Sequence, residues 1–334
     1  METKPLSPPA QIMKFIVGKW ISKPIYVAAE LGIADMLADH PKSIEELAHA
    51  THSHAPFLYR MMRALASVGI FFETEGQRFE LTPMAECLKA DAMRSIALLF
   101  NSEWSDKAWG HFMDSVKTGN TAFEKAYGME ISDWLARTPQ AARIFNEANA
   151  IKAAGSHNVI VDVYDFSGIR TLTDVGGGTG ALITEILNSN LLMKGFVADI
   201  SSVIQEAKKT FQAHGIEDRC QAIECDFFKK IPFGSDIFLM SNILHDWPDE
   251  QCRKILTNCR RAMKKDSKLL VVEMIIPLGN KPSIAKLLDL EMLVMTGGRE
   301  RTKAEFKNLF ELSGFKLSRI IPTKESLCII EGTL

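Results

Sequence analysis

Residues 241–250, SNILHDWPDE, place a histidine, a tryptophan and three acids directly behind the apolar run of residues 236–240. A strand that is apolar throughout is covered on both faces of its sheet. The carboxyl end of such a strand is where an open α/β sheet binds its ligands. His245 is therefore a candidate general base. Asp246 either orients His245 or, as we prefer, caps the helix that begins near Pro248.

A glycine-rich segment, TDVGGGTGALITEIL, lies between an expected strand and an expected helix, and contains Asp174, Gly176, Gly177 and Gly178. Glycines there let the backbone approach a ligand closely, and the N–H groups of the following helix face its anionic groups. Asp199 ends the next expected strand, where its carboxylate can accept hydrogen bonds from both ribose hydroxyls of a nucleotide-like cofactor. An NAD site would share these features.

Asp226 and Phe227 favour a different cofactor. The segment IECDFF puts Asp226 at the end of the third expected strand, where it can accept the exocyclic amine of adenine while Phe227 covers the ring. Ala181 also replaces the third glycine of the dinucleotide-binding pattern. Two aspartates at successive strand ends therefore predict an adenosyl group that is held through both ribose and base.

Hydrophobic periodicity predicts the elements that would position these residues. Residues 1–165 read as nearly all helix, whereas strands and helices alternate from residue 170 onward, which predicts a doubly wound α/β sheet. The expected strands are 171–175, 194–199, 221–225, 236–241 and 268–274, followed by an antiparallel pair at 316–322 and 326–331. The expected helices are about 181–190, 201–213, 249–264, 283–296 and 303–313.

Residues 26–90 have the pattern of a winged helix. Ser43 and Glu46 form a capping box at the start of one helix, and an amphipathic helix, PFLYRMMRALASVGIF, precedes two short strands around residues 75–77. Winged helices commonly bind DNA, but the expected recognition helix carries only Arg60 and Arg63 and is mainly apolar. We therefore favour a dimerisation or lid role for this module.

The composition excludes several classes of function. The 334 residues are enough for two domains, and the net charge of −2 offers no basic surface for nucleic acid or an anionic membrane. No apolar run has membrane-spanning length, and the first ten residues lack the layout of a signal peptide, so we expect a cytoplasmic protein. The six cysteines form no CxxC pair, which predicts buried reduced thiols and no metal site.

The motifs DVGGGTG, LHDWPDE, VVEMIIP and GGRERT, together with Asp199 and Asp226, resemble in order and spacing the S-adenosylmethionine-dependent O-methyltransferases of the caffeate and hydroxyindole type. This resemblance implies a Rossmann-like class I methyltransferase sheet with an antiparallel final strand, preceded by a mainly helical, winged-helix-like dimerisation domain. It also implies S-adenosylmethionine as cofactor, S-adenosylhomocysteine as product, and a homodimer. The expected domains are 1–95 for dimerisation, 96–165 for a helical segment at the substrate pocket, and 166–334 for catalysis.

The resemblance also implies roles for individual residues. His245 would deprotonate an acceptor hydroxyl between two flanking acids, Glu273 and Glu300. A neutral imidazole can accept a phenolic proton, and a carboxylate on its far nitrogen would fix the tautomer. The scheme needs no metal. The expected cofactor-binding residues are Asp174, Gly176, Gly177, Gly178, Asp199, Asp226, Phe227 and Ser241, and the expected acceptor contacts are Trp104, Phe145, Asn149, Asp246 and Met292.

Departures from the plant pattern point to bacterial members of the family. Ser241 stands where a lysine is often found four residues before the histidine, and Asn149 stands where a pocket methionine is usual. We therefore expect a small aromatic or polyketide-like hydroxyl acceptor. A carbon or nitrogen acceptor on the same scaffold is the first alternative, and a ligand-sensing DNA-binding regulator is a distant one. Asp289 is a further candidate for the pocket.

Overall fold

The structure is a computed structural model that describes residues 7–324 and 326–334, without the side chains of residues 153–159 and 202. Contacts divide the chain into two units, and each is described by itself. The first unit comprises Met1–Asp106 and Thr138–Ile151, and the second comprises Lys107–Arg137 and Lys152–Leu334. The three domain boundaries expected from the sequence stay a prediction.

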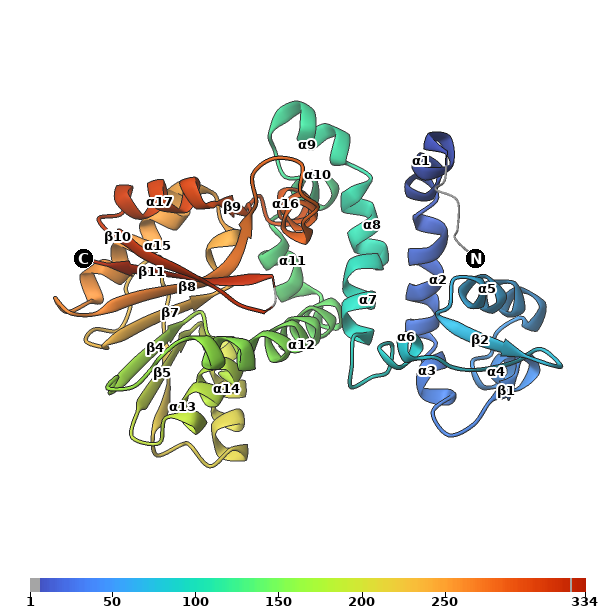
Figure 1. The fold of residues 1–334 in the computed structure, drawn as a ribbon, viewed down its shortest axis with the longest axis horizontal. Helices are drawn as coiled ribbons and strands as arrows, with labels where there is room; N and C mark the ends of the chain where they lie inside the picture. Colours follow the sequence, from blue (N-terminus) through green and yellow to red (C-terminus); the bar gives the residue numbers. More distant parts are fainter. Residues whose placement is uncertain (1–6, 325) are drawn as a thin grey trace. The chain divides into compact units, whose positions relative to one another are not determined.

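The first unit is helical and contains a small antiparallel sheet (Figure 1). Its helices are α1 (Pro8–Ile16), α2 (Lys19–Glu30), α3 (Ile33–Met36), α4 (Ile44–Ala50), α5 (Ala55–Ser67), α6 (Pro83–Glu86) and α7 (Arg94–Asn101). The sheet order is β1 (Lys42–Ser43), β3 (Arg78–Leu81) and β2 (Phe71–Thr74). The predicted capping box opens α4, because the Ser43 hydroxyl accepts the Glu46 N–H at 3.2 Å and the Glu46 carboxylate accepts the Ser43 N–H at 2.6 Å. This helix-and-hairpin arrangement confirms the predicted winged-helix-like front.

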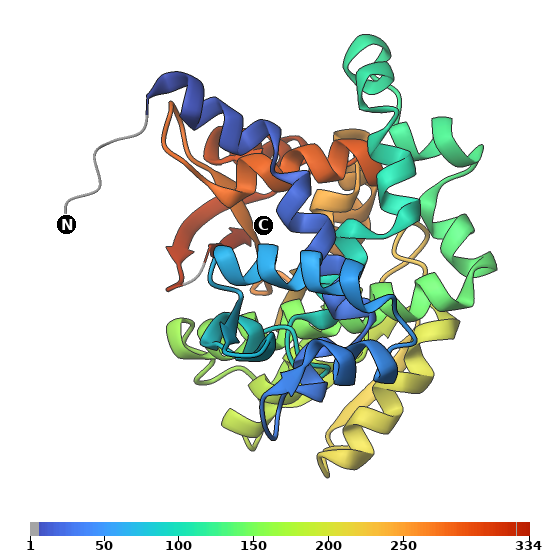
Figure 2. The same cartoon turned by 90° about the vertical axis from the view of Figure 1, so that its right-hand side faces the viewer.

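Helix α5 packs beside α2 (Figure 2). It buries one apolar stripe in the core of the first unit. The buried residues are Leu58, Met62 and Leu65, as the 3.6-residue period predicts. Val68, in the last turn of the predicted amphipathic segment, is 44% exposed because α5 ends at Ser67. The hairpin turn that follows β2 has Gly76 at φ 73° and Gln77 at φ 55°.

The second unit is built on a mixed sheet whose main path has the order β10-β11-β8-β7-β4-β5-β6, with β9 paired to β8. The strands are β4 (Thr171–Val175), β5 (Lys194–Asp199), β6 (Cys220–Glu224), β7 (Ile237–Ser241), β8 (Lys268–Ile276), β9 (Arg301–Thr302), β10 (Lys316–Pro322) and β11 (Leu327–Thr333). Strands β4 to β8 are parallel, and β11 pairs antiparallel with both β8 and β10. The antiparallel final strand is thus confirmed, and the order reverses between β4 and β7, which is the usual ligand position in such sheets.

Helices cover both faces of this sheet (Figure 1). They are α13 (Ala181–Ser189) and α14 (Ser201–Ala213) over one face and α15 (Asp249–Ala262) and α17 (Lys303–Leu312) over the other. The remaining helices are α9 (Phe112–Thr118), α10 (Ala122–Tyr127), α11 (Ile131–Arg137) and α16 (Ile284–Met295), while α8 (Glu103–Trp109) and α12 (Pro139–Val163) contribute to both units. The central strands are buried on both faces, which explains why they read as continuous apolar runs.

The cysteine and membrane expectations can be compared with the described part of the chain. Cys252 and Cys259 are buried on one face of α15 as expected, whereas Cys87 is exposed, contrary to the expectation of buried thiols. Within residues 7–324 and 326–334, no helix is long and apolar enough to cross a membrane. In the same residues no group of three His, Cys, Asp or Glu side chains is arranged to hold a metal ion.

A buried carboxylate, Glu331, anchors the final strand. Its oxygens accept hydrogen bonds from Arg319 at 2.9 Å, from the Ser318 hydroxyl at 2.7 Å and from the Tyr164 hydroxyl at 2.7 Å. Burial would raise the pKa of Glu331, but these donors and the nearby Lys268 ammonium lower it to about 2. The ionised form therefore stabilises the fold above the ordinary glutamate pKa, and this stability is lost as the pH falls through about 2.

Replacing Tyr164 with phenylalanine is expected to lower the free energy of unfolding at pH 7 by about 1–2 kcal/mol, because a buried, charged acceptor loses one donor. Urea unfolding measures this change. The matched control is Tyr59→Phe, which removes a hydroxyl bonded at 2.9 Å to the half-buried Glu73 and should cost less. Equal losses in the two variants would contradict an anchoring role for Glu331.

Candidate active site

His245 lies in a tight turn between β7 and α15. After β7 ends at Ser241, Asn242 adopts φ 52°, and Leu244–Asp246 form one turn of 3₁₀ helix. Asparagine tolerates this left-handed conformation better than most residues, so the chain can leave the sheet sharply. The turn places His245 at the carboxyl edge of the sheet with only 8% of the residue exposed.

Two glutamates hold His245 through different atoms. Glu300 Oε1 lies 2.7 Å from His245 Nδ1, while Glu273 Oε1 accepts the His245 backbone N–H at 3.1 Å. Glu273 comes from β8 and Glu300 from the segment after α16, where its own N–H donates to Asp289 Oδ1 at 2.9 Å. The structure therefore brings the three predicted catalytic residues together, and Asp289 positions one of them.

Both glutamates are dehydrated. Glu273 is 0% and Glu300 is 1% exposed, and the Oε2 atom of each has no hydrogen-bond partner among the described residues. Burial, together with the Glu300 charge, raises the pKa of Glu273 to about 7. Burial alone would lower the pKa of His245, but the carboxylates of Asp246, Glu300 and Glu273 raise it to about 9. The site thus favours a positive charge on the imidazole ring.

Asp246 is a neighbour of the imidazole rather than a helix cap. Its Oδ1 lies 3.7 Å from His245 Nε2. Pro248 is the N-cap residue of α15 and no side chain caps that end, so the preference for Asp246 as a cap was wrong. The physical reason is the 3₁₀ turn, which ends at Asp246 and directs its carboxylate back toward the histidine.

The predicted cofactor residues lie at the neighbouring strand ends. Asp199 Oδ2 accepts the Gly178 N–H at 2.8 Å, and its Oδ1 accepts the Ile200 N–H at 2.7 Å. Asp226 accepts the Phe228 N–H at 3.0 Å and is paired with Lys229 at the same distance. In the β5–β6 register, Asp199 pairs with Glu224, and Asp226 follows shortly after Glu224 in the chain. Asp199 and Asp226 therefore lie at the same edge of the sheet.

The glycine loop supplies the floor of this region. A Cβ atom at Gly176 would lie 2.4 Å from Ile243 Cδ1, and the backbone φ of 72° also disfavours a side chain there, whereas the Cβ position of Gly178 is open. Behind the loop, Asp174 is 1% exposed and its Oδ2 has no hydrogen-bond partner among the described residues. Burial and the Asp199 charge raise the pKa of Asp174 to about 7. Phe227 contacts the rings of Phe228 and Trp247.

These residues fit S-adenosylmethionine. Among the described residues, each Asp199 oxygen accepts one backbone N–H, which leaves lone pairs for the two ribose hydroxyls. The open position at Gly178 lets a ligand approach the loop backbone, and the unpartnered Asp174 carboxyl lies behind that loop. Ser241, the last residue of β7, is half-buried between the cofactor edge and the His245 turn. The fold and this edge together define a methyltransferase that uses S-adenosylmethionine.

Comparison with known proteins identifies the family. An O-methyltransferase domain matches residues 109–316, and an O-methyltransferase dimerisation domain matches residues 13–91. The chain belongs to this O-methyltransferase family. It is 44% identical to a phenazine O-methyltransferase of Lysobacter antibioticus, over 96% of this chain and 95% of that protein. It is also 30% identical to an 8-amino-8-demethylriboflavin N,N-dimethyltransferase of Streptomyces davaonensis, over 92% of this chain and 90% of the relative.

Solved structures agree with this assignment. The crystal structure of LaPhzM has a TM-score of 0.94 at 43% identity, covering 98% of this chain and 99% of the other. Human N-acetylserotonin methyltransferase in complex with S-adenosylmethionine has a TM-score of 0.89 at 25% identity, covering 100% and 99%. The resemblance to the hydroxyindole type and the expected cofactor are thereby confirmed.

The predicted acceptor residues fall in both units. Trp104, Phe145 and Asn149 belong to the first unit, whereas Asp246 and Met292 belong to the second. Phe145 and Asn149 lie four residues apart on α12 and are both half-buried. Asp246 is the acceptor candidate that the structure places beside His245.

Two side chains near the site in the second unit were not predicted from the sequence. Glu291 on α16 accepts the Trp109 indole N–H at 2.8 Å, and Arg301 is fully buried behind the His245 turn. The sequence around Glu291 did not indicate a functional residue, because Glu291 is one acid in an amphipathic helix. Arg301 lies in GGRERT, where a charged residue is normally expected at the surface.

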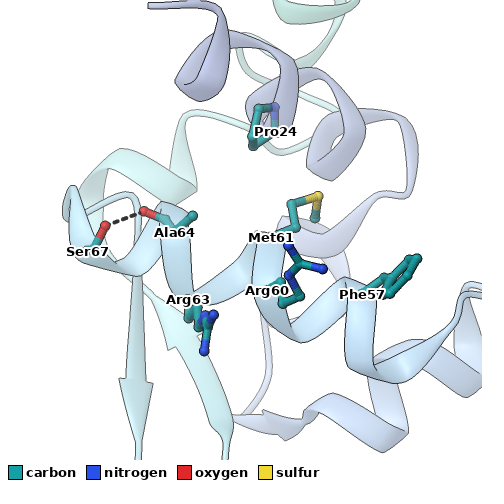
Figure 3. Close-up of a pocket in the computed structure, with 7 residues that line it drawn as sticks. All are labelled: Pro24, Phe57, Arg60, Met61, Arg63, Ala64 and Ser67. Atoms are coloured by element: carbon teal, nitrogen blue, oxygen red, sulfur yellow. Dashed lines mark hydrogen bonds between the residues drawn. The ribbon is translucent and has the colours of Figure 1, made fainter. Parts of the chain in front are cut away.

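A surface groove of about 750 Å³ in the first unit is lined by apolar and basic side chains, unlike the acidic surroundings of His245 (Figure 3). It is lined by Pro24 of α2 and by side chains of α5. Its two cations lie over aromatic rings, with Arg60 5.7 Å from the Phe57 centroid and Arg63 5.6 Å from the Tyr59 centroid. The groove holds no acid–base pair of the kind found at His245.

Replacing Asp174 with asparagine is expected to stabilise the protein above pH 7 by roughly 1–3 kcal/mol and to weaken S-adenosylmethionine binding. The native pKa is raised, so ionising Asp174 costs stability as the pH rises from about 4 to 7. The free energy of unfolding of the variant, measured with urea, should therefore increase relative to that of the wild type as the pH rises from about 4 to 7.

The same substitution at Asp226, whose side chain is 42% exposed, is the control and should change the unfolding free energy little. A pH-independent difference between Asp174→Asn and the wild type would contradict a buried titrating carboxyl at this position.

Proposed function

We propose that this chain transfers the methyl group of S-adenosylmethionine to a hydroxyl of a small aromatic acceptor, with His245 as the general base. The observation that carries the proposal is the 2.7 Å contact between His245 Nδ1 and Glu300 Oε1. In the neutral ring, a proton on Nδ1 that is donated to Glu300 leaves the Nε2 lone pair available for an acceptor hydroxyl. The cofactor supplies an electrophilic methyl group on a sulfonium centre, which leaves as a neutral thioether.

The surrounding acids suit His245 to accept a phenolic proton. Phenols have a pKa near 10, and the carboxylates of Asp246, Glu300 and Glu273 raise the pKa of His245 to about 9. The raised pKa makes the neutral imidazole a stronger base, but it keeps the ring protonated below about pH 9, so turnover is expected to rise as the pH approaches 9. Glu300 then stabilises the imidazolium that forms, while Glu273 keeps the backbone of the turn in place.

The acceptor is proposed to be a fused or substituted aromatic ring that carries a hydroxyl group. The relative at 44% identity is a phenazine O-methyltransferase, so hydroxyphenazines are the first acceptors to test. Asp246 and Met292 of the second unit, and Trp104, Phe145 and Asn149 of the first, are the proposed contacts. The matched dimerisation domain supports a homodimer.

Methyl transfer to nitrogen is the second candidate, because one relative at 30% identity is an N,N-dimethyltransferase. An amine acceptor attacks through its own lone pair and needs no base before methyl transfer. Its turnover would therefore tolerate loss of the imidazole, whereas a hydroxyl or carbon acceptor would not. A DNA-binding regulator has less support, because Arg60 and Arg63 pack over aromatic rings of their own helix.

The His245→Ala variant is expected to lose methyl transfer to a hydroxyphenazine by about 10²–10⁴-fold in kcat, since a general base contributes that much. Transfer of labelled methyl from S-adenosylmethionine measures the rate, and calorimetry should show cofactor affinity within about twofold of wild type. The control is His214→Ala, which removes an exposed histidine at the end of α14. Wild-type turnover of a hydroxyl acceptor by His245→Ala would remove His245 from the reaction.

A further inference from the structure

We propose that Arg301 is a positioning residue for His245, which it acts on through the backbone of the turn that carries the imidazole. Arg301 is 0% exposed and is the largest fully buried side chain among the described residues. Its guanidinium touches neither the imidazole ring nor either glutamate by a hydrogen bond in the structure. The inference rests on the proposed role of His245.

The guanidinium bridges both ends of the 3₁₀ turn. Its Nη1 donates to the Leu244 carbonyl oxygen at 2.9 Å, and its Nη2 donates to the Trp247 carbonyl oxygen at the same distance. These carbonyls precede His245 and follow Asp246 in the chain. A guanidinium holds its donors in a rigid planar fork, whereas the three donors of an ammonium share one freely rotating atom, so arginine fixes the two carbonyls in a more defined geometry.

Arg301 is itself held in one orientation. Asp249, the first residue of α15, accepts from Nε at 3.0 Å and from Nη2 at 2.7 Å through its Oδ1 atom. The Cys252 sulfur lies 3.3 Å from Nη2. The side chain therefore joins the His245 turn to the start of the following helix.

The backbone around Arg301 braces the same turn. The Arg299 N–H donates to the His245 carbonyl oxygen at 2.8 Å, and Glu300 reaches the imidazole. A Cβ atom at Gly298 would overlap the backbone of His245 and Asp246, so only glycine lets the two segments pack together. Residues 298–301, which we call the brace segment, thus contact the turn through four consecutive positions.

Arg301 also sets the charge behind the site. Its positive charge lowers the pKa of the buried Glu273, against the burial that raises it. Without this cation, the ammonium of Lys152, whose charge interacts with Asp246 and Glu300, would be left to offset the three carboxylates that face the imidazole. A neutral replacement is therefore expected to raise the pKa of His245 as well as to loosen the turn.

The test compares Arg301→Met and Arg301→Lys with the surface control Arg260→Met, in which the lost side chain donates to the Gly314 carbonyl oxygen. Arg301→Met is expected to lower kcat by about 10–100-fold, as a misplaced catalytic group does, with the Kd for S-adenosylmethionine within about twofold. Arg301→Lys should recover part of this loss, because it restores the charge but not the fork. The control should keep wild-type kcat.

Two measurements distinguish a misplaced His245 from a general loss of native structure in Arg301→Met. In the His245→Ala background, Arg301→Met should cost no further kcat, and NMR titration of the His245 ring should give a higher pKa in Arg301→Met than in wild type. An equal kcat loss in that background, or wild-type kcat in Arg301→Met, would overturn the inference. If Arg301→Met does not fold, wild-type kcat in Arg301→Lys would overturn it.

Failure of the proposed function is recognised separately. It is seen when His245→Ala alone keeps wild-type turnover. In that case the tautomer of the His245 ring in Arg301→Lys still tests the positioning role, because this variant keeps the charge and a displaced turn would lose the contact between Nδ1 and Glu300.

Discussion

The 2.7 Å contact between His245 Nδ1 and Glu300 Oε1 joins two groups that are almost completely removed from water. Each charge buried in this way costs several kcal/mol unless partners offset the lost hydration. The partners come from four elements: the β7–α15 turn, strand β8, helix α16 and the brace segment. The site can therefore exist only where these elements meet, at the carboxyl edge of the parallel strands.

This constraint explains several features that would look unrelated in isolation. Arg301 is buried because its guanidinium satisfies the carbonyls of the turn and offsets the acids behind it. Gly298 lacks a side chain because the brace segment must lie against the turn. The Asp289 side chain on α16 accepts the Glu300 N–H, which fixes the carboxylate that faces the imidazole. The cofactor edge on β4, β5 and β6 is built more simply, from a glycine loop and strand-end acids.

Much of this arrangement could be predicted from local patterns. Strands β4, β5 and β10 have the predicted bounds, because buried strands flanked by turns leave a clear hydrophobic signal. His245, Glu273 and Glu300 were predicted from motifs and do lie together. Asp246 was misjudged and Arg301 was missed, since a 3₁₀ turn and a buried cation depend on contacts between segments about fifty residues apart. Local sequence carries no record of which charged residue such contacts will bury.

The most direct test of this account is NMR of the His245 ring in cofactor-free enzyme labelled with ¹⁵N-histidine. We expect the neutral ring to carry its proton on Nδ1, facing Glu300, and its pKa to lie well above the ordinary value of 6.5. Glu300→Gln should lower that pKa, because a carboxylate that stabilises the imidazolium is removed. A proton on Nε2, or a pKa at or below 6.5 in the wild type, would contradict the central claim.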